Sequence, residues 1–319
     1  MRALSRICCL LALTFTPVAL HAQAAQTVTL PAPRLGGYIQ VREVAQEGVG
    51  LSASLNRARF SIDGPLPARF SYRFLVELEA PAGVRVPAIV ALREAIARWS
   101  PGAFALTGGQ FKTPFSREYL LPVPYLETPD FAAVVDSLSP KYDVGLMAEY
   151  TFGPYATVFT GVFNGEGQNA VANRDSTVML VSRLTVRPVA QVTLGANVAR
   201  DGGDSLRWGT EVNMEERGAV VRAEYITRHR RGRARDQDDF GWYVLGVFRL
   251  LPQLQLLARQ EDFQRPSYGI ARRVRATTVG SIVEIAPQRV RLLVDAVRRT
   301  SGPSQTEVDT FIAQLQVRF

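Results

Sequence analysis

The sequence predicts an all-β protein, a transmembrane antiparallel β-barrel of about 16 strands with short periplasmic turns and long extracellular loops. Three observations predict it. Segments of about eight to eleven residues alternate apolar and polar side chains, the connections between them alternate between short and long, and the chain ends on an aromatic strand residue. Beyond the N-terminal segment, no run of roughly 18 apolar residues could form a spanning helix.

The first element is a signal peptide, predicted over residues 1–24. Arg2 and Arg6 form its basic start, an apolar stretch over 7–20 follows, and Ala22-Gln23-Ala24 supplies a small-x-small cleavage site. Both cysteines of the chain, Cys8 and Cys9, lie inside this segment, so the mature protein is expected to contain neither disulfides nor thiolate chemistry. Residues 25–319 are then predicted to form a single barrel domain.

Sixteen segments with two-residue alternation follow, each bounded by turn residues. They are 36–44, 55–63, 69–78, 89–98, 104–111, 143–152, 155–164, 177–187, 191–200, 206–215, 219–228, 241–250, 254–263, 276–285, 290–300 and 310–319.

The connections indicate which end of each strand faces the periplasm. Short turns such as Gly153-Pro154 and Pro252-Gln253 alternate with longer connections. The connections expected to be long follow Val44, Leu78, Phe111, Asn164, Arg228, Phe263 and Thr300; the connection at Asp201 is brief. This alternation places the C-terminus on the short-turn rim, as an even-stranded barrel of the outer membrane requires.

A membrane-facing strand surface must be apolar, whereas the lumen surface can carry charge. In the segment 69–78, Phe70, Phe74 and Leu78 are expected to face lipid, with Arg73 and Glu77 facing the lumen. An arginine on the lipid face costs roughly 2 to 4 kcal/mol, so the register of each strand is strongly specified.

The fourth segment does not follow this rule. Around Arg93, Glu94 and Arg98, charged residues fall on both faces of the expected strand. We therefore expect these charges to lie in a loop or at the barrel rim.

The last segment carries apolar side chains at every second position from Phe311 to Phe319. A C-terminal strand that ends in an aromatic residue resembles the assembly signal of Gram-negative outer-membrane proteins. The resemblance implies that Phe319 is recognised by the barrel-assembly machinery.

Three motifs resemble the phosphate-selective porin O and P family. They are GGQFKTPFSREYL at Gly108, RARFSIDG at Arg57 and VFNGEGQN at Val162. The resemblance implies a sixteen-stranded, generally trimeric outer-membrane porin for phosphate or other anions, in which the loop over residues 112–142 narrows the pore.

The proposed constriction loop departs from the family in its charge. Lys112, Arg117 and Lys141 face four acidic residues, Glu118, Glu127, Asp130 and Asp136. Family members named for phosphate selectivity line the pore with arginines and lysines. General diffusion of small hydrophilic solutes is therefore expected, while a phosphate preference stays open.

An anion pathway needs fixed positive charge on the lumen wall. Arginine suits this role because its planar fork binds phosphate or carboxylate through two bonds. The candidates are Arg42, Arg57, Arg59, Arg73, Lys112 and Arg117, followed by Arg222, Arg259, Arg291 and Arg318. The alternative is that the arginines pair with acidic wall residues, namely Glu77, Glu211, Glu224, Glu261 and Asp295, and fill the lumen.

The run RHRRGRARDQDD at residues 228–239 is expected in an extracellular loop. Its basic half could bind lipopolysaccharide phosphates or gather anions at the mouth, or it could pair with its own acidic half. The net charge of +8 would favour nucleic acid as a partner, but export and the lack of a basic helix argue against it.

Enzymatic function is not expected, because the predicted mature chain has one histidine, His229, with no suitable catalytic or zinc-binding neighbours. No cofactor or metal is expected. The sequence predicts a passive outer-membrane channel, with lipid, lipopolysaccharide and small anions as partners. The alternatives are a non-conducting structural or adhesin-like barrel and an outer-membrane hydrolase.

Overall fold

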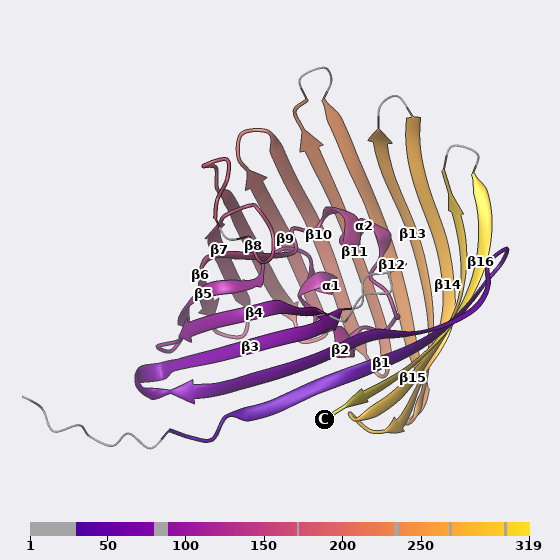
Figure 1. Cartoon of the computed structure of the whole chain (residues 1–319), viewed down its shortest axis with the longest axis horizontal. Helices are drawn as coiled ribbons and strands as arrows, with labels where there is room; N and C mark the ends of the chain where they lie inside the picture. Colours follow the sequence, from indigo (N-terminus) through magenta and orange to yellow (C-terminus); the bar gives the residue numbers. More distant parts are fainter. Residues whose placement is uncertain (1–29, 80–88, 171, 233–235, 268–269, 303–304) are drawn as a thin grey trace, which may run out of the picture. The chain divides into compact units, whose positions relative to one another are not determined.

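The computed structural model describes residues 30–79, 89–170, 172–232, 236–267, 270–302 and 305–319. The predicted signal peptide lies outside these residues. Within the described part, sixteen strands form one closed antiparallel barrel in which β1 pairs with β16 (Figure 1). The fold class predicted from the alternation is thus confirmed.

Each predicted segment corresponds to one strand. The strands are β1 (Arg34–Gln46), β2 (Gly50–Leu66), β3 (Phe70–Glu79), β4 (Ile89–Trp99), β5 (Phe104–Lys112), β6 (Tyr142–Phe152), β7 (Ala156–Phe163), β8 (Met179–Val189), β9 (Val192–Asp201), β10 (Ser205–Glu216), β11 (Ala219–Arg230), β12 (Gln237–Leu251), β13 (Leu254–Ser267), β14 (Ile270–Ala286), β15 (Val290–Ser301) and β16 (Thr306–Arg318).

Several strands are longer than predicted at the extracellular rim. The long connection expected after Phe263 is largely strand, because β13 and β14 continue to Ser267 and from Ile270. Only residues 47–49 separate β1 from β2. Beyond the hydrocarbon layer the backbone ladder still satisfies N–H and C=O groups, but the side chains need not alternate. The sequence signal therefore ends before the strand does.

The predicted inward and outward faces agree with the burial of the side chains. In β3, Phe74 is half exposed on the outer face while Glu77 is buried. In β15, Arg291 and Asp295 are buried in the lumen and Ala296 is exposed. The outer surface is therefore apolar, and the polar residues of these strands point inward.

The irregular fourth segment is explained by a β-bulge, and its expected place in a loop or at the rim is wrong. Leu75 pairs with Glu94 and Val76 pairs with Leu92, which leaves Arg93 as the extra residue of β4. Arg93 Nε donates to Glu77 Oε2 at 2.6 Å, and Arg73 Nε donates to Glu94 Oε2 at 2.8 Å. The bulge allows two consecutive charged residues to reach the lumen.

Gly109 and Gln110 of β5 support this bulge. Gly109 has a φ of +124°, and a Cβ there would lie 2.0 Å from the Ala95 carbonyl oxygen. The Gln110 amide nitrogen donates to the carbonyls of Leu92 and Arg93, at 2.9 and 3.3 Å. The Gly-Gln pair of the GGQFK motif therefore fits β5 against a strand that bulges.

We predict that Gly109→Ala lowers the yield of folded barrel, because it adds both backbone strain of about 1–3 kcal/mol and a steric overlap. Heat-modifiable migration in gels and the unfolding temperature measure the effect. Gly108→Ala is the matched control, since a Cβ there meets only Leu146 Cδ1 at 3.5 Å. Equal yields of the two variants would contradict the prediction.

Phe319 is held at the seam of the barrel. Its N–H donates to the Gly37 carbonyl and its carbonyl accepts from the Gly37 N–H, both at 3.1 Å. A Cβ at residue 37 would lie 2.7 Å from the Phe319 ring, and the ring centroid lies 5.7 Å from that of Phe60. The terminal residue is thus tied into the closed sheet; its role as an assembly signal stays a prediction.

The helices are short: η1 (Pro67–Arg69), α1 (Arg117–Leu120), η2 (Val123–Tyr125) and α2 (Ala133–Leu138). None of the helices in the described ranges has the length and apolar character needed to cross a membrane. Three of them belong to the connection between β5 and β6.

Candidate functional site

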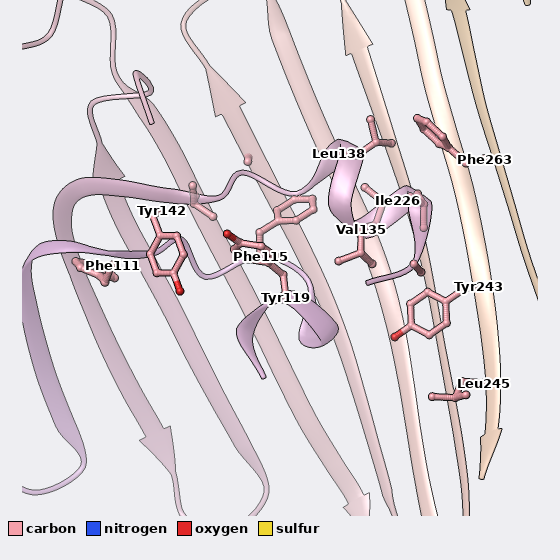
Figure 2. Packing of buried hydrophobic residues seen from close by; sticks show 14 of the residues in the cluster. Phe111, Phe115, Tyr119, Val135, Leu138, Tyr142, Ile226, Tyr243, Leu245 and Phe263 are labelled. Carbon is pink, nitrogen blue, oxygen red and sulfur yellow. The ribbon is translucent and has the colours of Figure 1, made fainter. Parts of the chain in front are cut away.

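The connection between β5 and β6, residues 113–141, folds into the barrel; we call it the inner loop. Its helix α2 packs against β11, β12 and β13. Val135 and Leu138 of α2 lie beside Ile226, Tyr243 and Phe263 of these strands (Figure 2). An apolar core therefore exists inside the lumen, on one side of the barrel.

Wall carboxylates hold the helix N-termini of the inner loop. The first two N–H groups of α1 donate to Glu211 and Glu224, at 2.9 and 2.6 Å. The first N–H of α2 donates to Glu261 at 2.7 Å. These carboxylates satisfy helix-terminal donors that have no partner within the helix.

Four of the candidate arginines also hold the inner loop. Arg259 donates to Thr128 Oγ1 at 2.7 Å and to the Asp130 carbonyl at 2.9 Å. The other three contacts are Arg42 with Asp130 at 2.8 Å, Arg222 with Glu127 at 2.5 Å, and Arg291 with the carbonyls of Pro124 and Leu126. These side chains position the loop; their part in an anion pathway stays a prediction.

Two further candidates, Arg117 and Arg318, lie at the same loop. Arg117 is half-buried on α1, and its own N–H is one of those bound by the wall. The Arg318 guanidinium lies 4.6 Å from the centroid of the Tyr125 ring.

Glu118 links the two helices of the inner loop. Its side chain is buried, accepts from the Ala132 N–H at 2.9 Å and lies 3.8 Å from Arg259. Burial raises the pKa of Glu118 to about 8 despite the nearby guanidinium. The loop is thus joined to the wall by a buried, ionisable contact.

A cavity of about 370 Å³ lies between the inner loop and β1–β6. It is lined by Gly37, Tyr38, Arg59, Ser61, Arg73, Leu75, Glu94, Lys112, Leu120, Pro122, Val123, Pro124, Tyr125 and Tyr142. A larger depression of about 920 Å³, lined by Val279, Ala296 and Phe311 among others, lies among side chains of the outer face. It does not belong to the lumen.

The cavity wall carries more positive than negative charge. Arg59 pairs with Glu77 at 2.9 Å, and Glu77 also binds Arg93. Arg57 and Lys112, in contrast, donate to neutral acceptors: Arg57 to Gln40 Oε1 at 3.2 Å, and Lys112 to the carbonyls of Tyr119 and Leu121 at 2.6 and 3.0 Å. Among the described residues, neither cation forms an ion pair with a carboxylate. Their charge is not neutralised locally.

Arg73 has 39% of its side chain exposed. It lines the cavity and contacts both Glu94 at 2.8 Å and Asp63 at 3.5 Å. The structure therefore brings Arg59, Arg73 and Lys112 together at one cavity, with Arg57 beside them.

A second connection, residues 164–178, also reaches into the lumen. Gln168 Oε1 accepts from Arg93 at 2.5 Å. The Asn169 N–H donates to Gln110 Oε1 at 2.6 Å, and Asn169 Oδ1 accepts from the Gln110 amide at 3.0 Å. The motif VFNGEGQN carries the family resemblance in the sequence, but it does not predict these contacts with β4 and β5.

Half of the charged run at residues 228–239 lies in strands and not in a loop, because β11 continues to Arg230 and β12 begins at Gln237. Arg228 belongs to β11 and Asp239 to β12. Asp239 pairs with Arg228 and Arg230, and His229 Nδ1 lies 2.8 Å from Asp238. The pairing of the basic half with the acidic half is confirmed.

Comparisons with known proteins agree with this architecture. Residues 36–192 match the family model of phosphate-selective porin O and P, which confirms the resemblance carried by the motifs. No curated protein sequence matches the chain.

Several solved structures are similar over 90% of this chain. The trimer form of OmpT from Vibrio cholerae has a TM-score of 0.66 and 10% identity, with 99% of its chain covered. The anion-selective porin from Comamonas acidovorans has a TM-score of 0.67 and 10% identity, again with 99% covered. A mutant of the Rh. blastica porin has a TM-score of 0.64 and 14% identity, with 100% covered. At these identities the likeness establishes the fold.

Proposed function

We propose that the chain belongs to the phosphate-selective porin O and P family of outer-membrane porins. On this premise, it conducts small hydrophilic anions passively between the inner loop and β1–β5. The inner loop, with Lys112 and Tyr142 at its two ends, is proposed as the constriction of a single barrel domain spanning 25–319. Its backbone N–H groups donate to wall carboxylates and its backbone carbonyls accept from wall arginines, which favours a fixed opening.

One observation carries the anion preference. Arg57 and Lys112 remain without an ion-pair partner in the described chain, beside a cavity that Arg59 and Arg73 also line. Low-dielectric walls focus the field of such charges and raise the local concentration of anions. The acidic residues Glu127 and Asp130 of the inner loop are bound to wall arginines, so they repel anions less than the sequence suggested.

The proposal also includes the oligomeric state, the partners and the absence of catalysis. The trimer form of the Vibrio cholerae protein supports a homotrimer, and outer-membrane lipid, lipopolysaccharide and the assembly machinery are the expected partners. We propose that the protein has no catalytic activity. His229 contacts aspartates at the extracellular rim, and among the described residues it forms no hydrogen bond with a nucleophilic side chain.

Planar-bilayer recordings test this function. We expect stepwise increases in conductance on addition of the folded protein, and a reversal potential under a KCl gradient with the sign of chloride preference. Folded protein that produces no steps would support the non-conducting barrel instead. A reversal potential of the opposite sign would retain the channel and remove the anion preference.

A further inference from the structure

We propose that the cavity between the inner loop and β1–β6 is a saturable binding site for the carboxylate of a small organic anion with an apolar body. The inference rests on the proposed anion channel and adds to it a ligand class and a set of donors. It predicts that such anions bind during passage and do not merely diffuse past fixed charge.

Two tyrosine hydroxyls provide the first observation. Tyr38 and Tyr142 line the cavity and are only 6% and 3% exposed. Neither hydroxyl has a hydrogen-bond partner among the residues that the structure describes. A buried donor without a partner costs free energy, and an acceptor that enters the cavity would recover it.

Two cations provide the second observation. Arg59, 7% exposed, binds Glu77 through one terminal nitrogen, while its Nε has no partner in the described part of the chain. Lys112 uses two of its three N–H groups for the carbonyls of Tyr119 and Leu121. Each cation thus retains a donor for a ligand.

These donors fall into two pairs that line one cavity, and they are held by packing. The Arg59 guanidinium lies 5.9 Å from the centre of the Tyr38 ring, and Lys112 Nζ lies 5.9 Å from that of Tyr142. Tyr38 packs with Val123 and Leu126 of the inner loop. The Tyr142 ring lies 6.1 Å from that of Tyr119, edge to face. Donors fixed in this way bind an anion without further ordering.

The number and kind of lining groups select the ligand class. Two hydroxyls, one Nε–H and one ammonium N–H offer at least four donors, enough for the roughly four lone-pair sites of a carboxylate. The opposite lining is apolar, with Leu75, Leu120, Pro122 and Val123. A phosphate ion would place oxygens against these side chains, whereas the hydrocarbon part of an organic acid would be buried there.

Block of the chloride current tests the site. The chloride current is recorded in KCl for the wild-type protein and for the variants Tyr38→Phe and Tyr142→Phe while sodium benzoate is added stepwise. A parallel series adds inorganic phosphate at equal ionic strength. We expect benzoate to reduce the current of the wild type at lower concentration than phosphate does. Each substitution removes one hydrogen bond to a charged group and should raise the half-blocking benzoate concentration about tenfold.

The control is Tyr155→Phe, which changes an exposed residue next to the periplasmic turn at Gly153 and should leave the block by benzoate unchanged. The unfolding temperature of both cavity variants should stay constant or rise, because each loses a buried unpaired hydroxyl. Equal block of the wild type and both variants, or stronger block by phosphate, would overturn the site. If the wild type is anion-selective but benzoate does not block it, only the proposed binding site is contradicted. If the wild type is not anion-selective, the proposed anion channel itself is contradicted.

Discussion

Replacing Arg57 and Arg59 together by glutamine is expected to lower the anion-to-cation permeability ratio about tenfold, equivalent to ~1.4 kcal/mol. Arg57 has a neutral acceptor, so its loss removes charge that no described carboxylate offsets. Loss of Arg59 leaves Glu77 bound to Arg93, so that carboxylate is not left alone. Positive charge beside the cavity falls by two while the wall keeps its acidic residues. The reversal potential under a KCl gradient measures the change.

Arg298→Gln is the matched control for this experiment. Arg298 is exposed on the outer face of β15, where it pairs with Asp309 at 2.7 Å. Its removal takes away one positive charge, against two in the double variant, at a place outside the cavity lining, so it should not move the reversal potential. If the control and the double variant shifted the potential equally, the selectivity would arise from net charge and not from the cavity.

The second large effect is expected from Arg259→Ala. Arg259 is 5% exposed and joins Thr128 and Asp130 of the inner loop to the wall. Its removal also leaves Glu118 and Glu261 buried without the guanidinium that faces them at 3.8 and 3.9 Å. Breaking a buried pair from one side costs about 3 to 5 kcal/mol, so the inner loop should leave the wall.

Single-channel recordings and proteolysis detect this release. We expect a broader distribution of conductance levels and cleavage within residues 113–141, while the barrel remains resistant. Thr185→Ala offers a control for a partly buried hydrogen bond elsewhere, since Thr185 Oγ1 donates to the Thr157 carbonyl at 3.4 Å. A variant with one sharp conductance level and an intact loop would show that the apolar contacts of α2 alone hold the loop.

The fold was predictable because hydrocarbon outside and water inside impose one simple rule along every strand. Val41, Phe74 and Leu315 are exposed on the outer face, while Gln40 and Gln314 are buried in the lumen, as the alternation predicts. The β4 bulge at Arg93 was not predictable by the same rule, because one extra residue shifts the phase locally. Only the pairing of β4 with β3 showed which residue is extra.

The candidate site was predictable in its residue types but not in their roles. The inward positions of Arg42, Arg59, Arg73 and Arg259 followed from the strand phase. Which of them bind the inner loop and which line the cavity depends on where that loop lies in the lumen. The hydroxyls of Tyr38 and Tyr142, which have no hydrogen-bond partner among the described residues, could not be recognised from the sequence. The residues around a strand tyrosine do not show whether its hydroxyl is hydrogen-bonded.

By itself the sequence determined the closed sheet, its sixteen strands, the face to which the side chains of the regular strands point and the resemblance to a porin family. These properties are local: each follows from neighbouring residues and from the solvent on either side of the sheet. Only the tertiary structure decided that Arg42, Arg222, Arg259 and Arg291 anchor the inner loop while Arg59, Arg73 and Lys112 line a cavity. The physical reason is that an ion pair or a cavity forms between residues far apart in the chain, and its partners are chosen by how the inner loop packs against the wall.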